Sequence, residues 1–310
     1  MLNNISTKIN ELKESKSFSK NLFIIGMLAI PVIHFLIFFV WLNVDMVIST
    51  FRTFEFPEGQ VFAGFSNYIE VFTKILHEDE TQRVLLNSLL YLPITCFISL
   101  PLSIVFSFFL SKKIPFSRFF RVVYFLPNIL PIVVLTMAFS FSFDASWGPI
   151  NDILRNVFGM ELVPNWFGEY PTNQNMILLY CIWAGLGFNI LLLSGAIARI
   201  PDEIKEYTLL EGATWFQEFR LVTVPLIWST ISTTFLLGCT SVFTVMLQPL
   251  LLTPGNPDTK TLALSIYNAV IQNQSLEYYA TLGLVCSIIG LPVIMLIKKG
   301  INSIYEDADF

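Results

Sequence analysis

Few residues in this chain have both the type and the spacing that chemistry requires. Its two histidines, His34 and His77, lie far apart, and four cysteines lie singly in apolar stretches, at positions 96, 181, 239 and 286. The sequence contains no G-x-x-x-x-G-K-S/T phosphate loop, no G-x-G-x-x-G and no H-E-x-x-H. We therefore expect no catalytic residue, metal site or cofactor in this chain, and cysteines that pack as small apolar side chains.

The residues that do cluster are acids in the segment 199–225, where the sequence predicts a short helix. Pro201 followed by Asp202 and Glu203 is typical of a helix start, because proline and acids favour the first turn. Gly212 is a plausible stop, since glycine readily ends a helix in the left-handed conformation. A helix of about ten residues is expected between them.

This helix is predicted to have two faces. Ile204, Tyr207 and Leu210 lie along one side at helical spacing, while Glu203 and Glu206 stay in water. Such a helix can lie on lipid headgroups or dock into the groove of a partner protein. Membrane-surface helices favour Lys and Arg, so the acidic face favours a protein partner.

The composition indicates what surrounds these residues. Of 310 residues, 54% are hydrophobic, 30 are Phe and only 13% are charged, whereas soluble proteins carry about 25% charged residues. Lipid must therefore be a main solvent of the chain, which excludes a disordered protein, a disulfide scaffold and an ordinary cytosolic enzyme. The net charge of −5 leaves no basic domain for nucleic acid.

Six apolar runs without Asp, Glu, Lys or Arg are long enough to cross a bilayer. Runs this long predict helices, because the strands of a barrel would alternate over about ten residues. Prolines inside the runs predict kinks. We expect an all-α membrane protein with six transmembrane helices, at about 22–42, 84–110, 122–143, 176–198, 221–247 and 279–297.

The distribution of Lys and Arg predicts the orientation. The N-terminal segment, the second and fourth loops and the C-terminal tail together hold 13 of these residues, and the first, third and fifth loops hold five. The positive-inside rule then places both termini in the cytoplasm. Residues 1–21 are polar and are expected to form a cytoplasmic segment, not a signal peptide. A membrane domain over 22–298 and a cytoplasmic tail over 299–310 follow.

The fourth loop carries a family resemblance. Glu206-Tyr207-Thr208, three residues, Gly212, nine residues and then Val222-Thr223-Val224-Pro225 resemble the EAA loop of ABC importer permeases. In that pattern Glu-Ala-Ala is followed by three residues, Gly, nine residues, Ile, one residue and Leu-Pro. Glu, Gly and Pro match at their spacing, whereas Tyr207 and Thr208 stand in place of the two alanines.

Other segments are similar to the carbohydrate-uptake branch, of the maltose and glycerol-phosphate permease type. The resemblance covers about residues 20–300 and implies the type I ABC importer permease fold, multi-pass in the cytoplasmic membrane of a prokaryote. It implies import of a sugar or oligosaccharide with a second permease subunit, two ATPase subunits that hold ATP and Mg, and an extracytoplasmic solute-binding protein. The segments are Phe65–Tyr68, Phe119–Arg121, Phe125–Pro127, Trp147–Asn151, Gly187–Ile190 and Leu252–Gly255.

The resemblance also implies which residues couple the chain to an ATPase. The loop would act as a coupling helix in a cleft of the ATPase, with Glu206 facing a basic residue there; a solvated surface charge is the alternative for Glu206. The implied coupling residues are Glu203, Glu206, Tyr207, Leu210, Glu211, Gly212, Ala213 and Pro225.

A substrate path needs amides, hydroxyls and aromatic faces if the substrate is a sugar. Asn189 is the most informative candidate, because an amide in hydrocarbon needs a partner or a cavity, although a hydrogen bond between helices explains it equally well. The candidates are Trp183, Asn189, Ser241, Thr244 and Gln248.

Three alternatives stay open. A related permease could import a peptide or an acidic sugar derivative, although the absence of Lys and Arg from the spans argues against a strongly anionic ligand. An ion-coupled secondary transporter lacks support, because no chain of Asp, Glu or His crosses the spans and no internal repeat is evident. A membrane enzyme would need clustered acids or metal ligands, which the sequence does not show.

Overall fold

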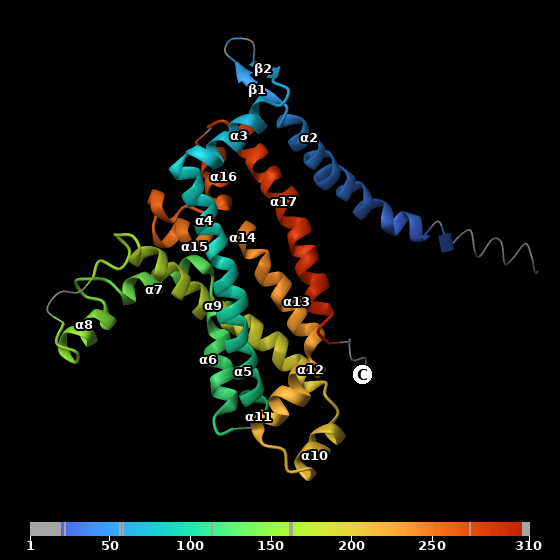
Figure 1. Cartoon of the computed structure of the whole chain (residues 1–310), viewed down its shortest axis with the longest axis vertical. Coiled ribbons are helices and arrows are strands. Elements are labelled where there is room, and N and C mark those ends of the chain that lie inside the picture. Colours follow the sequence, from blue (N-terminus) through green and yellow to red (C-terminus); the bar gives the residue numbers. More distant parts are fainter. Residues whose placement is uncertain are drawn as a thin grey trace, which may run out of the picture. The chain divides into compact units, whose positions relative to one another are not determined.

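A computed structural model describes residues 20–305, apart from positions 22, 56, 58, 113, 161–163 and 273. The predicted leader up to residue 19 and the end of the tail from residue 306 lie outside the described residues. The chain divides into two compact units, Met1–Ile69 and Glu70–Phe310. Helices dominate both, as the composition predicts, and Figure 1 shows their course.

The first unit contains one long helix followed by a hairpin. The helix runs over Phe23–Ser49, includes the π-helical turn η1 (Leu36–Trp41) and α2 (Leu42–Ser49), and exposes nearly all its described side chains. The antiparallel hairpin β1 (Arg52–Glu55) and β2 (Gly59–Phe62) was not predicted. The Asn67 amide, in the first turn of α3 (Ser66–His77), donates to the carbonyls of Thr50 at 2.9 Å and Arg52 at 2.7 Å, which holds the hairpin base.

The second unit has three further helices long enough to cross a membrane within the described residues. The first joins α4 (Asp79–Pro93), η2 (Ile94–Ser99) and α5 (Leu100–Ser111); the others are α9 (Thr172–Ala198) and α17 (Leu276–Asn302). The wide π-helical turn η2 lies between Pro93 and Pro101. A proline removes one helical hydrogen bond, and a π turn is a common way to accommodate it.

Two predicted spans are broken rather than continuous. α6 (Ser117–Ile129) and α7 (Ile132–Ser142) meet at 109°, where Leu130 is extended before Pro131. A residue before proline is driven out of the helical region, which explains the break. The second broken pair bends by 75° at Ile227. It joins the run α11 (Trp215–Gln217), η3 (Glu218–Thr223) and α12 (Val224–Leu226) to α13 (Trp228–Cys239) and α14 (Ser241–Thr244).

Shorter helices fill the loops. The third loop carries α8 (Pro149–Asn156), the fourth α10 (Asp202–Leu210), and the fifth α15 (Leu247–Leu252), η4 (Pro257–Thr259) and α16 (Leu262–Ile271). The buried Asn151 of α8 donates to the carbonyls of Phe143 at 2.9 Å and Asp144 at 2.7 Å and accepts from Trp166 Nε1 at 2.8 Å. The aromatic third loop is therefore folded around the Asn151 side chain.

Helix α9 is the centre of the second unit. It packs along α5 and α6, and its lower half shares a buried core with the start of α13 (Figure 1). The members of this core are all aliphatic: Leu100, Leu193, Ala196, Ile197, Ile200, Ile227 and Ile231. Among the described cysteines, Cys96 and Cys239 are buried and all four are free, and the described residues contain no cluster of His, Cys, Asp or Glu that could hold a metal.

Gly187 marks the closest approach of α6 and α9. A Cβ added to Gly187 would overlap the Tyr124 carbonyl oxygen and the Asn128 amide, whereas one added to Gly195 on the same helix would meet nothing within 4 Å. We expect Gly187→Ala to lower stability by about 1–3 kcal/mol through overpacking. Thermal unfolding of the chain in lipid nanodiscs measures this, with Gly195→Ala as the matched control; equal melting temperatures for the two variants would contradict the packing.

Candidate functional site

The helix predicted in the fourth loop exists, and its local signals explain its ends. α10 starts directly after Pro201, and Gly212 follows it in the left-handed conformation at φ +67°. The turn is closed by the amides of Glu211 and Gly212, which donate to the carbonyls of Tyr207 at 3.0 Å and Leu209 at 3.1 Å. A non-glycine residue would be strained at this position.

The two faces of α10 differ from the prediction in one respect. Ile204 turns inward and packs against the aliphatic core around α9, and Thr208 is buried beside it. Tyr207 and Leu210 instead are 64% and 87% exposed, so the predicted apolar stripe is divided between the core and the outside. Glu206 is exposed as well. The inner side fixes the helix to the molecule and leaves the outer side free for a partner.

The remaining predicted coupling residues are not all on this surface. Glu203 and Glu211 are exposed on α10 and directly after it, Ala213 is half-buried, and Pro225 lies apart in α12, next to the 75° bend. Between them a new helix starts at Thr214, whose amide donates to Gln217 Oε1 at 2.8 Å in a capping box. Pro225 therefore belongs to the bend rather than to the α10 surface.

A partly buried ion pair beside the loop is absent from the sequence prediction. Lys112, from the loop after α5, contacts Glu218 in η3, and their side chains are 35% and 10% exposed. The Lys112 ammonium also lies 5.1 Å from the centre of the Phe108 ring. The pair borders a cavity of about 430 Å³. It links the second cytoplasmic loop of the prediction to the fourth.

The candidate path residues do not form one lining in this conformation. Trp183 packs in an aromatic cluster with Phe139 at 5.8 Å between ring centres, and Asn189 is six residues further along α9, about 120° around the helix. Ser241 is buried, with its hydroxyl 3.3 Å from that of Thr95, whereas Thr244 is exposed.

Gln248 is separated from both Ser241 and Thr244. It lies in α15, beyond the end of α14, and is half-buried. Ser241 and Thr244 also differ in their hydrogen bonds: Thr244 donates to its own helix, to the Thr240 carbonyl at 3.2 Å, while Ser241 reaches across to η2. A common path through these side chains would need another conformation of the helices.

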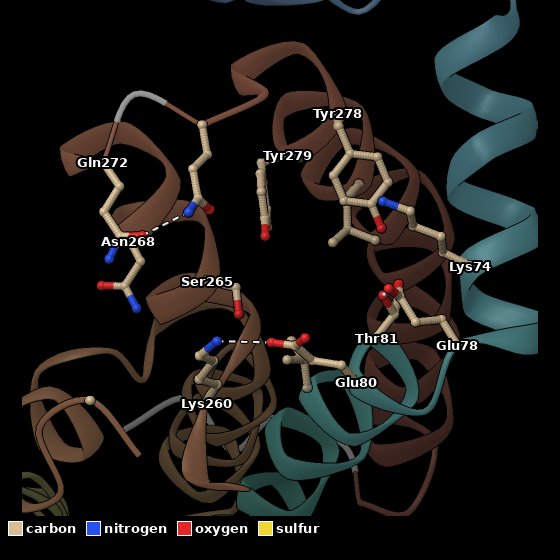
Figure 2. Close-up of a pocket in the computed structure, with 14 residues that line it drawn as sticks. Lys74, Glu78, Glu80, Thr81, Lys260, Ser265, Asn268, Gln272, Tyr278 and Tyr279 are labelled. Atoms are coloured by element: carbon tan, nitrogen blue, oxygen red, sulfur yellow. Dashed lines mark hydrogen bonds and ion pairs between the residues drawn. The ribbon is translucent and has the colours of Figure 1, made fainter. Parts of the chain in front are cut away.

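The structure adds a polar cavity that sequence reasoning missed. It measures about 390 Å³ and is bordered by α3, α4, the loop before α16, α16 itself and α17. Figure 2 shows polar and aromatic side chains around it, with Lys260 paired to Glu80 at 2.8 Å. Lys74 pairs with Glu70 at 2.9 Å and lies 4.3 Å from the centre of the Tyr278 ring. Burial lowers the pKa of Lys74, but its bond to Glu70 and nearby negative charge outweigh this and raise it.

A clasp of hydrogen bonds between α4 and the fifth loop fixes the segment that carries Lys260, one of the residues that line this cavity. Asn87 donates to the carbonyls of Asp258 at 2.7 Å and Lys260 at 3.0 Å, and Arg83 pairs with Asp258 at 2.7 Å. The Leu262 amide, at the start of α16, donates to the Ser88 hydroxyl at 2.7 Å. These partners are more than 170 residues apart in sequence, so no local pattern could predict them.

Comparison with known families decides the class of protein. The family model described as "Binding-protein-dependent transport system inner membrane component" matches residues 99–302, about two thirds of the chain. The chain belongs to this family. The matched range includes α10, Gly212 and Pro225, so the resemblance based on the fourth loop is confirmed.

The relatives of this permease include several named transport proteins. A probable ABC transporter permease, YurN of Bacillus subtilis, is 27% identical over 91% of this chain and 97% of its own length. The diacetylchitobiose uptake permease NgcF of Streptomyces coelicolor is 24% identical over 89% of this chain and 81% of its own. The maltose/maltodextrin permease MalF of Escherichia coli is 26% identical over 65% of this chain, which corresponds to 39% of MalF.

Solved structures give the fold of the permease. A bacterial ABC transporter that imports the acidic polysaccharide alginate contains a chain that matches 93% of this one with a TM-score of 0.80 at 18% identity. The predicted fold class, a helical ABC importer permease, is confirmed by this match and by the family. The range matched by the family model includes the parts of the cavity wall that come from the fifth loop, α16 and α17. It does not include the part that comes from α3 and α4.

Proposed function

We propose that this permease is one transmembrane subunit of an ATP-driven importer of a sugar or oligosaccharide delivered by a solute-binding protein. Its family is described as the inner membrane component of binding-protein-dependent transport systems. Two of its relatives are named for the transport of maltose/maltodextrin and the uptake of diacetylchitobiose. The solved alginate transporter was also captured with a periplasmic binding protein. The permease hydrolyses nothing itself; ATP and Mg bind to separate ATPase subunits.

The uncovered outer face of α10 supports the coupling role most directly. Large apolar side chains as exposed as Tyr207 and Leu210 are typical of a protein interaction site when they lie together at the tip of a loop. Glu206 beside them is suited to a basic partner residue. Ile204 fixes the helix to the α9 core, so movement of a docked ATPase is passed to the central helix.

The mechanism is a change between two conformations of the transmembrane subunits. Two permease subunits, of which this chain is one, rock between inward-facing and outward-facing states, and ATP and the loaded binding protein shift their populations. The breaks at Leu130 and Ile227 provide bend points within two of the helices.

The proposed setting is the cytoplasmic membrane of a prokaryote, with both termini inside. The excess of Lys and Arg in the even-numbered loops supports this orientation. The fourth loop then faces the ATPases, and the hairpin, the third loop and the fifth loop face the binding protein. Membrane lipid surrounds the helices, and nucleic acid has no role.

Uptake in a strain that lacks the gene tests the substrate class. Cells with and without the permease receive labelled maltose, diacetylchitobiose, a dipeptide and an alginate disaccharide in separate assays. We expect uptake of at least one neutral sugar to fall to background without the permease and to return with the gene. Loss of dipeptide uptake alone would mean that the substrate is a peptide and not a sugar. Unchanged uptake of all four compounds would refute the proposal.

A further inference from the structure

The polar cavity between α3, α4, α16 and α17 is built from groups that bind hydroxyls. Asn268 and Gln272 present amides from α16 and the segment after it, and Tyr279 presents a ring and a hydroxyl from α17, as Figure 2 shows. An amide both donates and accepts, so it can satisfy a hydroxyl in either role. An aromatic face packs against the C–H surface of a sugar ring.

Two hydroxyls in the wall, those of Ser265 and Tyr278, lack a hydrogen-bond partner within the described residues. The Ser265 side chain is only 7% exposed, and its hydroxyl makes no hydrogen bond there. Figure 2 shows Ser265 facing the centre of the cavity, between Tyr279 and the Lys260–Glu80 pair. Buried hydroxyls are normally satisfied, so this one calls for a partner that enters the cavity.

The charges of the wall favour an uncharged ligand. Lys74 and Lys260 are matched by Glu78 and Glu80, and each lysine already has a carboxylate partner. Glu78 accepts from the Thr81 hydroxyl at 2.6 Å. An anion would meet the two carboxylates and a cation the two ammonium groups, whereas neutral hydroxyls can bond to both.

The size of the cavity limits the ligand. Its volume of about 390 Å³ lies at the small end of the range of ligand pockets, about 300–1,000 Å³. That volume suits one or two sugar rings and is small for a longer chain. A single protein side chain would leave much of it unfilled.

We infer that this cavity is a binding site for a neutral mono- or disaccharide unit, separate from the candidate path residues on α9, α14 and α15. The inference rests on the proposed function, because that orientation places the cavity on the side where a binding protein releases its sugar. Tyr279 supplies the stacking face, Asn268, Gln272 and Ser265 supply hydrogen bonds, and the Lys260–Glu80 pair borders the ligand. A sugar bound there occupies the outer end of the helices before translocation.

Saturation-transfer NMR on the full-length permease in lipid nanodiscs tests this site directly. The probes are maltose, diacetylchitobiose and an alginate disaccharide, each without any binding protein present. We expect signal for at least one neutral disaccharide and none for the acidic one. Asn268→Ala is expected to weaken neutral binding about five- to tenfold, as the loss of one hydrogen-bonding group implies. Asn175→Ala, at an exposed amide near the outer end of α9, is the control and should bind like the unchanged chain.

Several results would overturn the inference. No transfer to either neutral disaccharide, equal transfer to the acidic one, or equal binding by Asn268→Ala and Asn175→Ala would refute the sugar site. Loss of binding-protein docking in Asn268→Ala without any sugar signal would make the cavity a protein contact. Uptake measured in cells with the same variants separates the two proposals, because sugar uptake that persists without a cavity signal leaves the proposed function intact.

Discussion

A permease with Glu206→Lys is expected to copurify poorly with its ATPase subunits and to lose at least about tenfold of its sugar uptake. Glu206 is exposed on the outer face of α10, beside Tyr207 and Leu210. Reversing the charge of a residue that meets a basic partner places two like charges together, which costs several kcal/mol at an interface. ATP hydrolysis that remains should no longer depend on loaded binding protein.

The control for this prediction is a charge reversal at an exposed glutamate elsewhere. Glu55 lies at the end of β1 in the first outer loop of the prediction and is exposed, so Glu55→Lys should copurify with the ATPase subunits normally. Copurification is measured by the ratio of ATPase to permease after affinity purification, and uptake in the same cells. Normal assembly and normal uptake by Glu206→Lys would mean that Glu206 is a solvated helix charge and that the coupling account is wrong.

The partly buried pair Lys112–Glu218 is expected to respond unequally to the removal of its two members. Lys112→Met leaves Glu218 charged, only 10% exposed and without its partner, and should cost about 1–3 kcal/mol of stability, the loss expected for a buried charged group left without a hydrogen-bond partner. Glu218→Met leaves a lysine that is 35% exposed and can reach water, so it should cost clearly less. The double variant Lys112→Met with Glu218→Met should recover most of the loss, because no buried charge remains.

Thermal unfolding of the permease in nanodiscs measures these differences. Lys298→Met, at an exposed position near the end of α17, removes a lysine without breaking a buried pair and should leave the melting temperature unchanged. Two observations would contradict this account of the pair: equal losses for the two single variants, or a double variant as unstable as Lys112→Met.

Local signals explain what could be predicted from the sequence. The uncharged runs predict the long helices because lipid demands both apolar side chains and closed backbone hydrogen bonds. Pro201 and Gly212 define α10 because each acts through its own backbone conformation. Both kinds of signal depend on neighbours in sequence, so one chain is enough to read them.

Long-range packing explains what could not be predicted. Periodicity placed Ile204 and Tyr207 on one side of α10, but contact with the α9 core partly buries Ile204 and leaves Tyr207 exposed. Prolines predicted kinks, and Pro131 accounts for the break at Leu130, but the size of the bend, 109°, could not be predicted from the sequence. Ser241 stays a path candidate, but its burial and its contact with Thr95, 146 residues away, could not be predicted from its neighbours in sequence.

The polar cavity shows the same limit. Lys74, Ser265 and Tyr279 come from three segments that share no motif, and the clasp through Asn87 joins α4 to the loop before α16. Polar residues in loops of a membrane protein are ordinary, so none of them carried a signal in isolation. Only their convergence around one space distinguishes them.

Sugar transport by reconstituted proteoliposomes tests the central claim most directly. The permease, its partner permease and the ATPases are purified together, and vesicles are loaded with ATP and Mg or with ADP and Mg. With the solute-binding protein and labelled sugar outside, we predict accumulation against a gradient only with ATP, blocked by orthovanadate and unaffected by dissipating ion gradients. Accumulation with ADP that follows a proton or sodium gradient would contradict the account and identify an ion-coupled transporter.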